Sequence, residues 1–284
     1  MMIKIELVEE IGDYISQIKA TGKTVGLVPT MGALHEGHVS LVEKAKSLCD
    51  VVVVSIFVNP TQFNNATDLE KYPRTLENDM SLLAPYGVDV VFAPTTSEIY
   101  PANYQAATIE LGKLDRVMEG EHRPGHFQGV VEVVKRLFEI TQPDFAFFGQ
   151  KDFQQVAVIK FMVEYFQMPV TIVECPIIRS EKGLALSSRN MRLSAEEKEQ
   201  ALVIYQTMVQ IQLNYEGFTP NEWMKKGVEL INAAGLETEY LEIVHPTTLE
   251  KLTDTWIDEA VCCVAAYCGS VRLIDNMTIR FPKN

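Results

Sequence analysis

The segment Thr24–His38 reads TVGLVPTMGALHEGH, and it decides the fold that we expect. It opens with an apolar run, Thr24–Val28, that is typical of a buried strand. The stretch after it, Val39–Leu48, has the apolar spacing of an amphipathic helix. These residues therefore predict a strand, a short polar turn and the start of a helix.

Two histidines, His35 and His38, stand at the start of that helix, three positions apart. They then lie on one face of its first turn. This turn also has unpaired backbone N–H groups and the positive end of the helix dipole, which together bind anions. Gly37 has no side chain between them, so a ligand can approach the backbone closely. The arrangement suits a nucleotide whose phosphates gain charge during a reaction.

Two simpler interpretations of this His-x-Gly-His pattern stay open at this point. In the first, the histidines are ordinary surface residues, and in the second they are half of a metal site. Both stay open because short motifs often match by chance. A zinc site needs further ligands at suitable spacing. The chain has five cysteines but no Cys-x-x-Cys pair. A metal site is therefore the weaker explanation.

Composition restricts the class of protein. A chain of 284 residues forms one large domain or two, and 47% apolar with 22% charged residues indicates an ordinary globular protein. We expect no secretory signal and no membrane span, and the odd cysteine count fits the reducing cytoplasm. A net charge of −13 argues against a nucleic-acid partner, since phosphate backbones require a positive surface.

The first part of the chain alternates between strands and helices. The expected strands are Thr24–Val28, Val51–Val58, Val88–Phe92, Phe145–Phe148 and Val170–Glu174. The helical patterns between them are Val39–Leu48, Thr75–Ala84, Phe127–Thr141 and Phe153–Phe166. The strands are apolar on both faces, which is typical of a parallel sheet with helices on each side. We therefore predict an α/β fold with a Rossmann-like, doubly wound parallel sheet for residues 1–176.

The character of the chain changes after about residue 176. Ser194 is a candidate N-cap for a helix to about Asn214, and Thr219 opens a second helix. Three strand-like runs follow, the last two joined by a hairpin. They are Glu239–His245, Ala260–Tyr267 and Val271–Thr278. These patterns predict a smaller α+β domain over residues 177–284.

Polar residues follow the expected strands, and ligands bind at the carboxyl ends of strands in such sheets. Asn59 and Gln62 offer neutral amides for hydroxyl and carboxylate groups. Lys151 and Asp152 lie in the turn after the fourth strand, where a lysine is well placed for a phosphate, and Gln155 follows on the same side of the next helix. Taken singly, each of these segments also has a simpler explanation. Asn59 and Gln62 fit an ordinary capping turn, and Lys151 with Asp152 fits a solvated lysine beside a capping aspartate.

Two loops add cationic and hydroxyl groups. Arg123, in the segment Glu119–Phe127, holds an anion or is an ordinary surface arginine. Ser187, Ser188 and Arg189 bind phosphate oxygens or form a polar linker between domains. The chain has neither a P-loop nor a Gly-x-Gly-x-x-Gly fingerprint. Phosphate binding therefore falls to the histidine-bearing helix start and to the lysine and arginine of these turns.

In this order on a βα scaffold, the motifs resemble the pantothenate synthetase (pantoate–β-alanine ligase) family, of the nucleotidyltransferase superfamily with the His-x-Gly-His motif. The resemblance covers about Thr24 to Arg192 and rests on the segments PTMGALHEGH (29–38), FVNPTQF (57–63), YPRT (72–75), RPGHF (123–127), FGQKDFQQ (148–155) and LSSRN (186–190). The chain length also fits, and Leu273–Asn276 resembles the family's ending less specifically.

The resemblance implies a function and an assembly. The function is ATP-dependent joining of (R)-pantoate to β-alanine through a pantoyl adenylate, giving pantothenate, AMP and pyrophosphate, with Mg²⁺. The implied fold is a nucleotidyltransferase-type Rossmann domain with a smaller C-terminal domain as a lid over the site. Family members are usually cytoplasmic homodimers.

Site roles follow from the resemblance. The implied ATP-binding residues are Met31, His35, His38, Gly149, Lys151, Asp152, Ser187, Ser188 and Arg189. Those implied in catalysis are His35, His38 and Lys151. The implied pantoate-binding residues are Met31, Asn59, Gln62 and Gln155. Asp79 is the implied magnesium-side carboxylate, although the second acid that the family often has beside it is Asn78 here. Glu119 and Arg123 resemble a dimer-related support of the site.

Three other functions explain less. Another nucleotidyltransferase of the same fold accounts for His-x-Gly-His but not for Asn59, Gln62 and Gln155. An aminoacyl-tRNA synthetase fragment is disfavoured by the acidic charge and by the lack of an anticodon-binding module. A catalytically inactive nucleotide sensor would lose some charged site residues, whereas both histidines, Lys151 and Arg189 are present.

Overall fold

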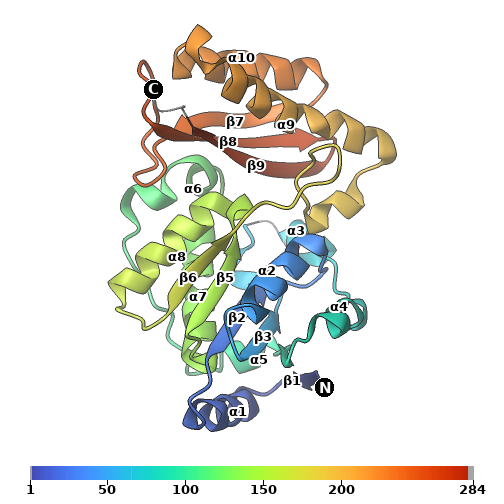
Figure 1. The fold of residues 1–284 in the computed structure, drawn as a ribbon, viewed down its shortest axis with the longest axis vertical. Helices are drawn as coiled ribbons and strands as arrows, with labels where there is room; N and C mark the ends of the chain where they lie inside the picture. Colours follow the sequence, from blue (N-terminus) through green and yellow to red (C-terminus); the bar gives the residue numbers. More distant parts are fainter. Residues whose placement is uncertain (1, 65, 281–284) are drawn as a thin grey trace. The chain divides into compact units, whose positions relative to one another are not determined.

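The computed structural model describes residues 2–64 and 66–280 (Figure 1). The chain divides into two compact units. The first comprises Met1–Gln150 and Gln154–Pro176, and the second comprises Lys151–Phe153 and Ile177–Asn284. The short piece Lys151–Phe153 belongs to the connection between a strand and a helix of the first unit, so the second unit is not one continuous segment.

A six-stranded parallel sheet forms the centre of the first unit. Its strands are β1 (Ile3–Ile5), β2 (Val25–Thr30), β3 (Val51–Ile56), β4 (Val90–Phe92), β5 (Phe145–Gly149) and β6 (Thr171–Cys175). They lie in the order β1-β4-β3-β2-β5-β6, and each pairing is parallel. The predicted α/β fold with a doubly wound sheet is confirmed.

Helices cover both faces of this sheet (Figure 1). The helices of this part of the chain are α1 (Val8–Ala20), α2 (Glu36–Lys46), α3 (Ala66–Lys71), α4 (Leu76–Leu83), α5 (Thr96–Ile99), α6 (Met118–His122), α7 (His126–Thr141) and α8 (Phe153–Tyr165). Leu27 and Val53 pack in one core with residues of α1, α7 and α8. Val28 and Val54 pack in a second core with residues of α2 and α4. Both sides of β2 and β3 are therefore buried, which explains their unbroken apolar runs.

Several elements are absent from the prediction, and all of them except α1 are short. α1 has apolar residues at helical spacing, Ile11, Ile15 and Ile18, which the prediction missed. The patterns predict nothing before Thr24, whereas β1 and α1 lie there. β1 has three residues, and Leu7, the residue before α1, makes no side-chain cap. The helices α3, α5 and α6 have six, four and five residues, which is too short for a helical period to be recognised.

The second unit is a three-stranded antiparallel sheet with two long helices. Its elements are α9 (Ala195–Asn214), α10 (Pro220–Ala233), β7 (Glu237–Val244), β8 (Glu259–Cys268) and β9 (Val271–Arg280). Ser194 and Thr219 begin the two helices with capping boxes, as their positions predict. The β8–β9 hairpin turns at Gly269, whose φ of 55° suits glycine. The predicted α+β fold is confirmed.

A buried ion pair braces the second unit. Arg179 donates to the two carboxylate oxygens of Asp275 at 2.5 and 2.9 Å. Burial raises the pKa of Asp275, and the charge of Arg179 opposes that shift. The neighbouring Asn276 donates from Nδ2 to the carbonyl of Lys151 at 2.9 Å, so β9 fixes the backbone that carries this lysine.

The longest helix in the described part of the chain is α9, with 20 residues. Neither α9 nor any other helix there is both long and apolar enough to cross a membrane.

Candidate active site

The polar motifs of the first unit meet at the carboxyl ends of three neighbouring strands. β2 ends at Thr30, β3 at Ile56 and β5 at Gly149, and β2 pairs with both of the others. From β2 the chain moves outward through β3 to β4, whereas β5 leads in the other direction to β6. The boundary between β2 and β5 is therefore the topological switch point, where ligands bind in open α/β sheets. A Cβ built on Gly149 meets no described atom within 4 Å, so its backbone is open to a ligand.

The two histidines cap the start of α2 with their own imidazoles. Nδ1 of His35 accepts from the N–H of Gly37 at 3.1 Å, and Nδ1 of His38 accepts from the N–H of His35 at 3.2 Å. The ring centroids lie 4.2 Å apart. The structure therefore brings both rings onto one face of the turn, as their spacing predicts.

This capping fixes how each imidazole presents its proton. Because Nδ1 is an acceptor in both rings, a neutral His35 or His38 carries its proton on Nε2. Both residues are partly exposed. The pair thus adds two N–H donors to a helix N-terminus that already favours anions.

Asp79 lies on α4, but its carboxylate binds the turn after β2. Oδ2 accepts from the N–H of Ala33 at 3.0 Å, and Oδ1 accepts from the N–H of Leu34 at 2.8 Å and the hydroxyl of Thr75 at 3.2 Å. The residue is 2% exposed. These bonds use three of the carboxylate's roughly four acceptor positions, and the side chain is buried, so the carboxylate does not suit direct coordination of a metal. Among the described residues, no group of three or more His, Cys, Asp or Glu could hold a metal ion.

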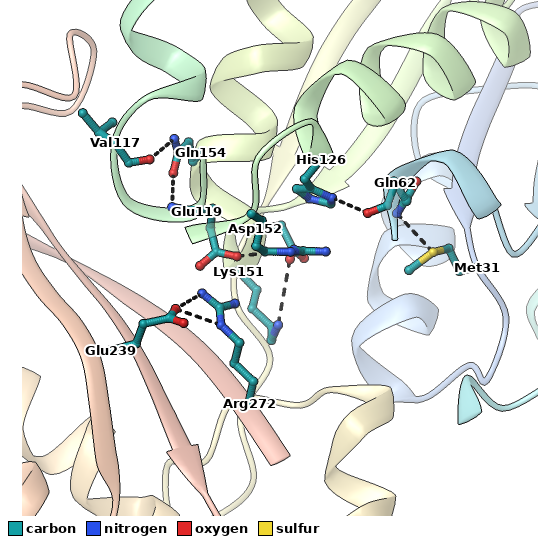
Figure 2. Close-up of polar contacts among 11 residues, drawn as sticks. Met31, Gln62, Val117, Glu119, His126, Lys151, Asp152, Gln154, Glu239 and Arg272 are labelled. Carbon is teal, nitrogen blue, oxygen red and sulfur yellow. Dashed lines mark hydrogen bonds and ion pairs between the residues drawn. The ribbon is translucent and has the colours of Figure 1, made fainter. Parts of the chain in front are cut away.

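Gln62 ends the 3-10 turn η1 (Pro60–Gln62) that follows β3. Its Nε2 donates to Sδ of Met31 at 3.1 Å, and its Oε1 accepts from Nδ2 of Asn59, also at 3.1 Å. Figure 2 shows the Gln62 side chain directed at Met31. The structure therefore brings together three of the residues that the resemblance implies at a pantoate site.

Asn59 differs from Gln62 because it is 1% exposed and bound on every side. Its Nδ2 also donates to the carbonyl of Gly129 at 3.1 Å. Its Oδ1 accepts from the Thr61 hydroxyl at 3.1 Å and from the Tyr100 hydroxyl at 2.9 Å. Asn59 is thus placed to orient Gln62 rather than to face a ligand.

Tyr100 is a site residue that the sequence analysis misses, because nothing in its surroundings marks it. Burial raises the pKa of Tyr100, so its hydroxyl stays protonated and donates to Asn59. The loop after α5 thereby supports the turn after β3.

Two residues of α7 contact η1 and hold it in place. Nδ1 of His126 donates to the backbone carbonyl of Gln62 at 2.9 Å (Figure 2). A Cβ on Gly129 would lie 2.5 Å from the carbonyl oxygen of Thr61. Glycine therefore permits the close approach of α7, and an isolated glycine in a helical pattern was the available signal.

Neighbouring glutamines at the start of α8 have different roles. The amide of Gln154, which is 4% exposed, accepts from the N–H of Glu119 at 3.0 Å and donates to the carbonyl of Val117 at 2.9 Å (Figure 2). It also donates to the carbonyl of Leu114 at 2.8 Å. It holds the loop before α7. Gln155 is partly exposed and stays a ligand candidate.

Arg123 forms an ion pair with Glu119, four residues before it. Its Nη1 lies 3.3 Å from Oε2 of Glu119, and the side chains are 23% and 9% exposed. Such burial is unlike that of an ordinary surface arginine. The pair is positioned to stiffen the end of α6.

In the second unit, Lys151 stands beside Asp152. Their Nζ and Oδ1 atoms are 4.0 Å apart, and the side chains are 18% and 46% exposed (Figure 2). The turn that the sequence places after the fourth expected strand is present as the 3-10 turn η4 (Gln150–Asp152), although the strand ends at Gly149 rather than at Phe148.

The serine–arginine segment also forms a tight turn in the second unit. Oγ of Ser187 accepts from the N–H of Arg189 at 3.2 Å and starts the 3-10 turn η5 (Ser188–Arg192). Ser188 and Arg189 are partly exposed.

Comparison with known proteins agrees with these motifs. The family model for pantoate-beta-alanine ligase matches residues 4–278. A pantothenate synthetase of Porphyromonas gingivalis is 50% identical over 273 residues, which cover 95% of this chain and 96% of that protein. One of Bacteroides fragilis is 50% identical over 276 residues, or 96% of this chain and 97% of that protein.

Solved structures extend the likeness to the fold. A pantothenate synthetase crystal structure from Thermus thermophilus has a TM-score of 0.92 at 42% identity and covers 99% of this chain and 100% of that one. A pantoate-beta-alanine ligase from Francisella tularensis, complexed with beta-gamma ATP and beta-alanine, has a TM-score of 0.83 at 37% identity, over 98% and 97% of the two chains. With matching motifs, sequence and fold over nearly its whole length, this chain belongs to the pantoate–β-alanine ligase family.

Proposed function

We propose that the chain carries out the reaction of its family in two steps, by way of a pantoyl adenylate. The reaction is the ATP-dependent condensation of (R)-pantoate with β-alanine to pantothenate, AMP and pyrophosphate. The family match over residues 4–278 supports the overall reaction. The observation that carries the mechanism is the mutually capped pair of His35 and His38 at the start of α2, beside the switch point.

In the first step, the pantoate carboxylate attacks the α-phosphorus of ATP in line with the departing pyrophosphate. Negative charge spreads over the phosphate oxygens, so catalysis depends on positioning and on preorganised donors. We assign Nε2–H of His35 and of His38 to oxygens near the α- and β-phosphates. Lys151 neutralises charge on the β/γ side, and no protein nucleophile is required.

The remaining ATP contacts follow from side-chain chemistry. Ser187, Ser188 and Arg189 offer hydroxyl and guanidinium donors to phosphate oxygens. The bare backbone of Gly149 and the half-exposed carboxylate of Asp152 suit the ribose. These assignments are supported by exposure and residue type.

Pantoate has two hydroxyls, a gem-dimethyl group and a carboxylate. We assign its oxygens to the amides of Gln62 and Gln155 and its methyl groups to the thioether of Met31. Met31 also borders the nucleotide in this proposal. Asn59 contributes by holding the Gln62 amide, since its own amide is bonded within the chain.

In the second step, the amine of β-alanine attacks the acyl carbon of the adenylate, and AMP leaves. Water would hydrolyse this mixed anhydride, so the site must exclude it. We assign part of that exclusion to the loop that carries Ser187–Arg189.

A divalent metal is consistent with an ATP-using ligase, and we propose Mg²⁺. The described residues offer no metal cage, and Asp79 does not fit a direct ligand because its oxygens bind Ala33, Leu34 and Thr75. Mg²⁺ commonly binds through substrate phosphates with few protein ligands. It is therefore best assigned to the phosphates of bound ATP.

We also propose a homodimer in the cytoplasm. Support for the compartment is that all five cysteines are buried free thiols. Light scattering of the purified protein tests the assembly, and a monomer mass would contradict the homodimer.

The deciding experiment is exchange of labelled pyrophosphate into ATP, with and without (R)-pantoate and without β-alanine. Pantoate-dependent exchange is expected, because adenylation is reversible before the amine arrives. ATP binding by a folded protein without exchange would refute the two-step mechanism.

A further inference from the structure

The carboxylate of Asp79 is buried and faces backbone N–H groups. Two successive N–H groups, those of Ala33 and Leu34, point at its oxygens at 3.0 and 2.8 Å. The third donor is the hydroxyl of Thr75 at 3.2 Å. Successive N–H groups that converge on one anion form a nest, and here the anion is a side chain of α4.

The nest exists because the turn after β2 has left-handed backbone. Gly32 has a φ of 81° and Ala33 a φ of 51°. This conformation is unfavourable for alanine, whose Cβ crowds the following carbonyl. Gly32 is also packed closely, since a Cβ there would lie 3.1 Å from Oδ2 of Asp79. A strained turn persists where its surroundings hold it, and Asp79 provides that hold.

The turn lies between two groups with proposed roles. Met31, just before it, accepts from Gln62. His35, just after it, is the N-cap of α2 and carries one of the capped imidazoles. A change at Gly32 and Ala33 therefore alters the distance between Met31, at the proposed pantoate site, and His35, at the proposed phosphate site.

We infer that Asp79 is a positioning residue that locks the Gly32–Leu34 turn and so sets His35 and His38 relative to Met31, and that it is not a metal ligand. This inference rests on the roles proposed above for the histidines. The turn is then held by the buried carboxylate of Asp79, and Mg²⁺ remains assigned to the phosphates of ATP.

The test compares Asp79→Asn with Glu77→Gln. Both remove one negative charge from the first turn of α4, but Glu77 is exposed. We expect Asp79→Asn to slow pantoate-dependent pyrophosphate exchange by ~10²-fold, as small misplacements of reacting groups do. The Mg²⁺ concentration for half-maximal exchange should not change, and Glu77→Gln should match the wild type.

A rescue variant separates positioning from the loss of a metal ligand. Ala33→Gly removes the Cβ that disfavours the left-handed turn, so it should restore part of the exchange rate in the Asp79→Asn background. The loss of a metal ligand would not be repaired in this way. Absence of rescue, or a large shift in Mg²⁺ dependence, would overturn the inference.

Amide hydrogen exchange keeps this test independent of the proposed reaction. In Asp79→Asn, the amides of Ala33 and Leu34 should exchange faster while those of the β2 strand stay protected. Unchanged protection of both amides would overturn the inference whatever the activity. If Asp79→Asn fails to fold, Thr75→Val removes a single donor and should show the same effects in weaker form. A Thr75→Val protein with wild-type activity and wild-type amide protection would then count against the inference.

Discussion

The side-chain amide of Asn59 donates to Oε1 of Gln62 over 3.1 Å, and this bond decides which end of the Gln62 amide faces Met31. With its oxygen engaged by Asn59, Gln62 presents its NH₂ group. That group is a donor, as the carboxylate and hydroxyl oxygens of pantoate require.

Replacing Gln62 by Ala should therefore raise the KM for pantoate by ~10- to 100-fold, the loss of a hydrogen bond to a charged group. The KM for ATP should change little. Tyr100→Phe, which removes one bond to Asn59, should give a smaller change in the same direction. Steady-state kinetics with each substrate varied in turn measures both, and equal effects on the two substrates would contradict the assignment of Gln62.

Replacing His38 by Ala should reduce AMP formation by ~10²–10³-fold, the usual effect of losing one donor to a developing charge. The same change removes a cap from α2, which costs about 1 kcal/mol of stability. His38→Gln separates the two effects, because glutamine at this helix position restores the reciprocal cap without the imidazole. We expect its melting temperature to recover and its rate to stay low. Wild-type turnover in His38→Ala would exclude the catalytic role.

Replacing Gly129 by Ala should destabilise the protein by about 1–3 kcal/mol, because the new Cβ would press on the Thr61 carbonyl. Its matched control is Gly12→Ala in α1, where a Cβ meets nothing within 4 Å. There the same substitution should stabilise by about 0.5–1 kcal/mol through helix propensity. Urea unfolding measures both changes. If both variants gained stability, the close approach of α7 to η1 would be wrong.

Cys49 gives a prediction about alkaline stability. Burial raises the pKa of Cys49 to about 11, and Asp144 and Asp50 add to the shift while Lys46 opposes it. The folded chain therefore holds this proton more tightly than the unfolded chain, whose thiol titrates near 9.0. The contribution is complete below pH 9 and decreases as pH rises toward 11. The stability difference between wild type and Cys49→Ala should thus shift against the wild type over this interval, and a constant difference in urea unfolding would argue against it.

Most of the long strands and helices were predictable from sequence because each has a period or a cap, and α1 is the exception. The runs from Val25 and from Val51 are buried on both faces, and Ser194 and Thr219 cap their helices as expected. β1 was not predictable, because its three residues gain their structure by pairing with β4. Local patterns carry no information on such distant partners.

The candidate site also has a part that was predictable from sequence and a part that was not. The spacing of His35 and His38 predicts a shared face, since three positions make one helical turn. The supporting contacts are not predictable, because they join distant parts of the chain. Asp79 was named only from the resemblance and for a metal role, and Tyr100 was missed. Asn59 shows the limit most clearly: its position suggested a ligand contact, and burial leaves it to orient its neighbour.

The switch point also bears on how the molecule is made. β2 pairs on one edge with β3, which follows closely in the chain. Its other edge pairs with β5, much later in the chain, where Gly26 lies opposite Phe145. A chain emerging from the ribosome therefore exposes one edge of β2 for the whole time that the intervening residues are synthesised, and such an edge invites pairing with other chains. The strand that completes the ligand-binding end of the sheet is the same strand that ends this exposure, so the catalytic architecture and protection from aggregation arrive together.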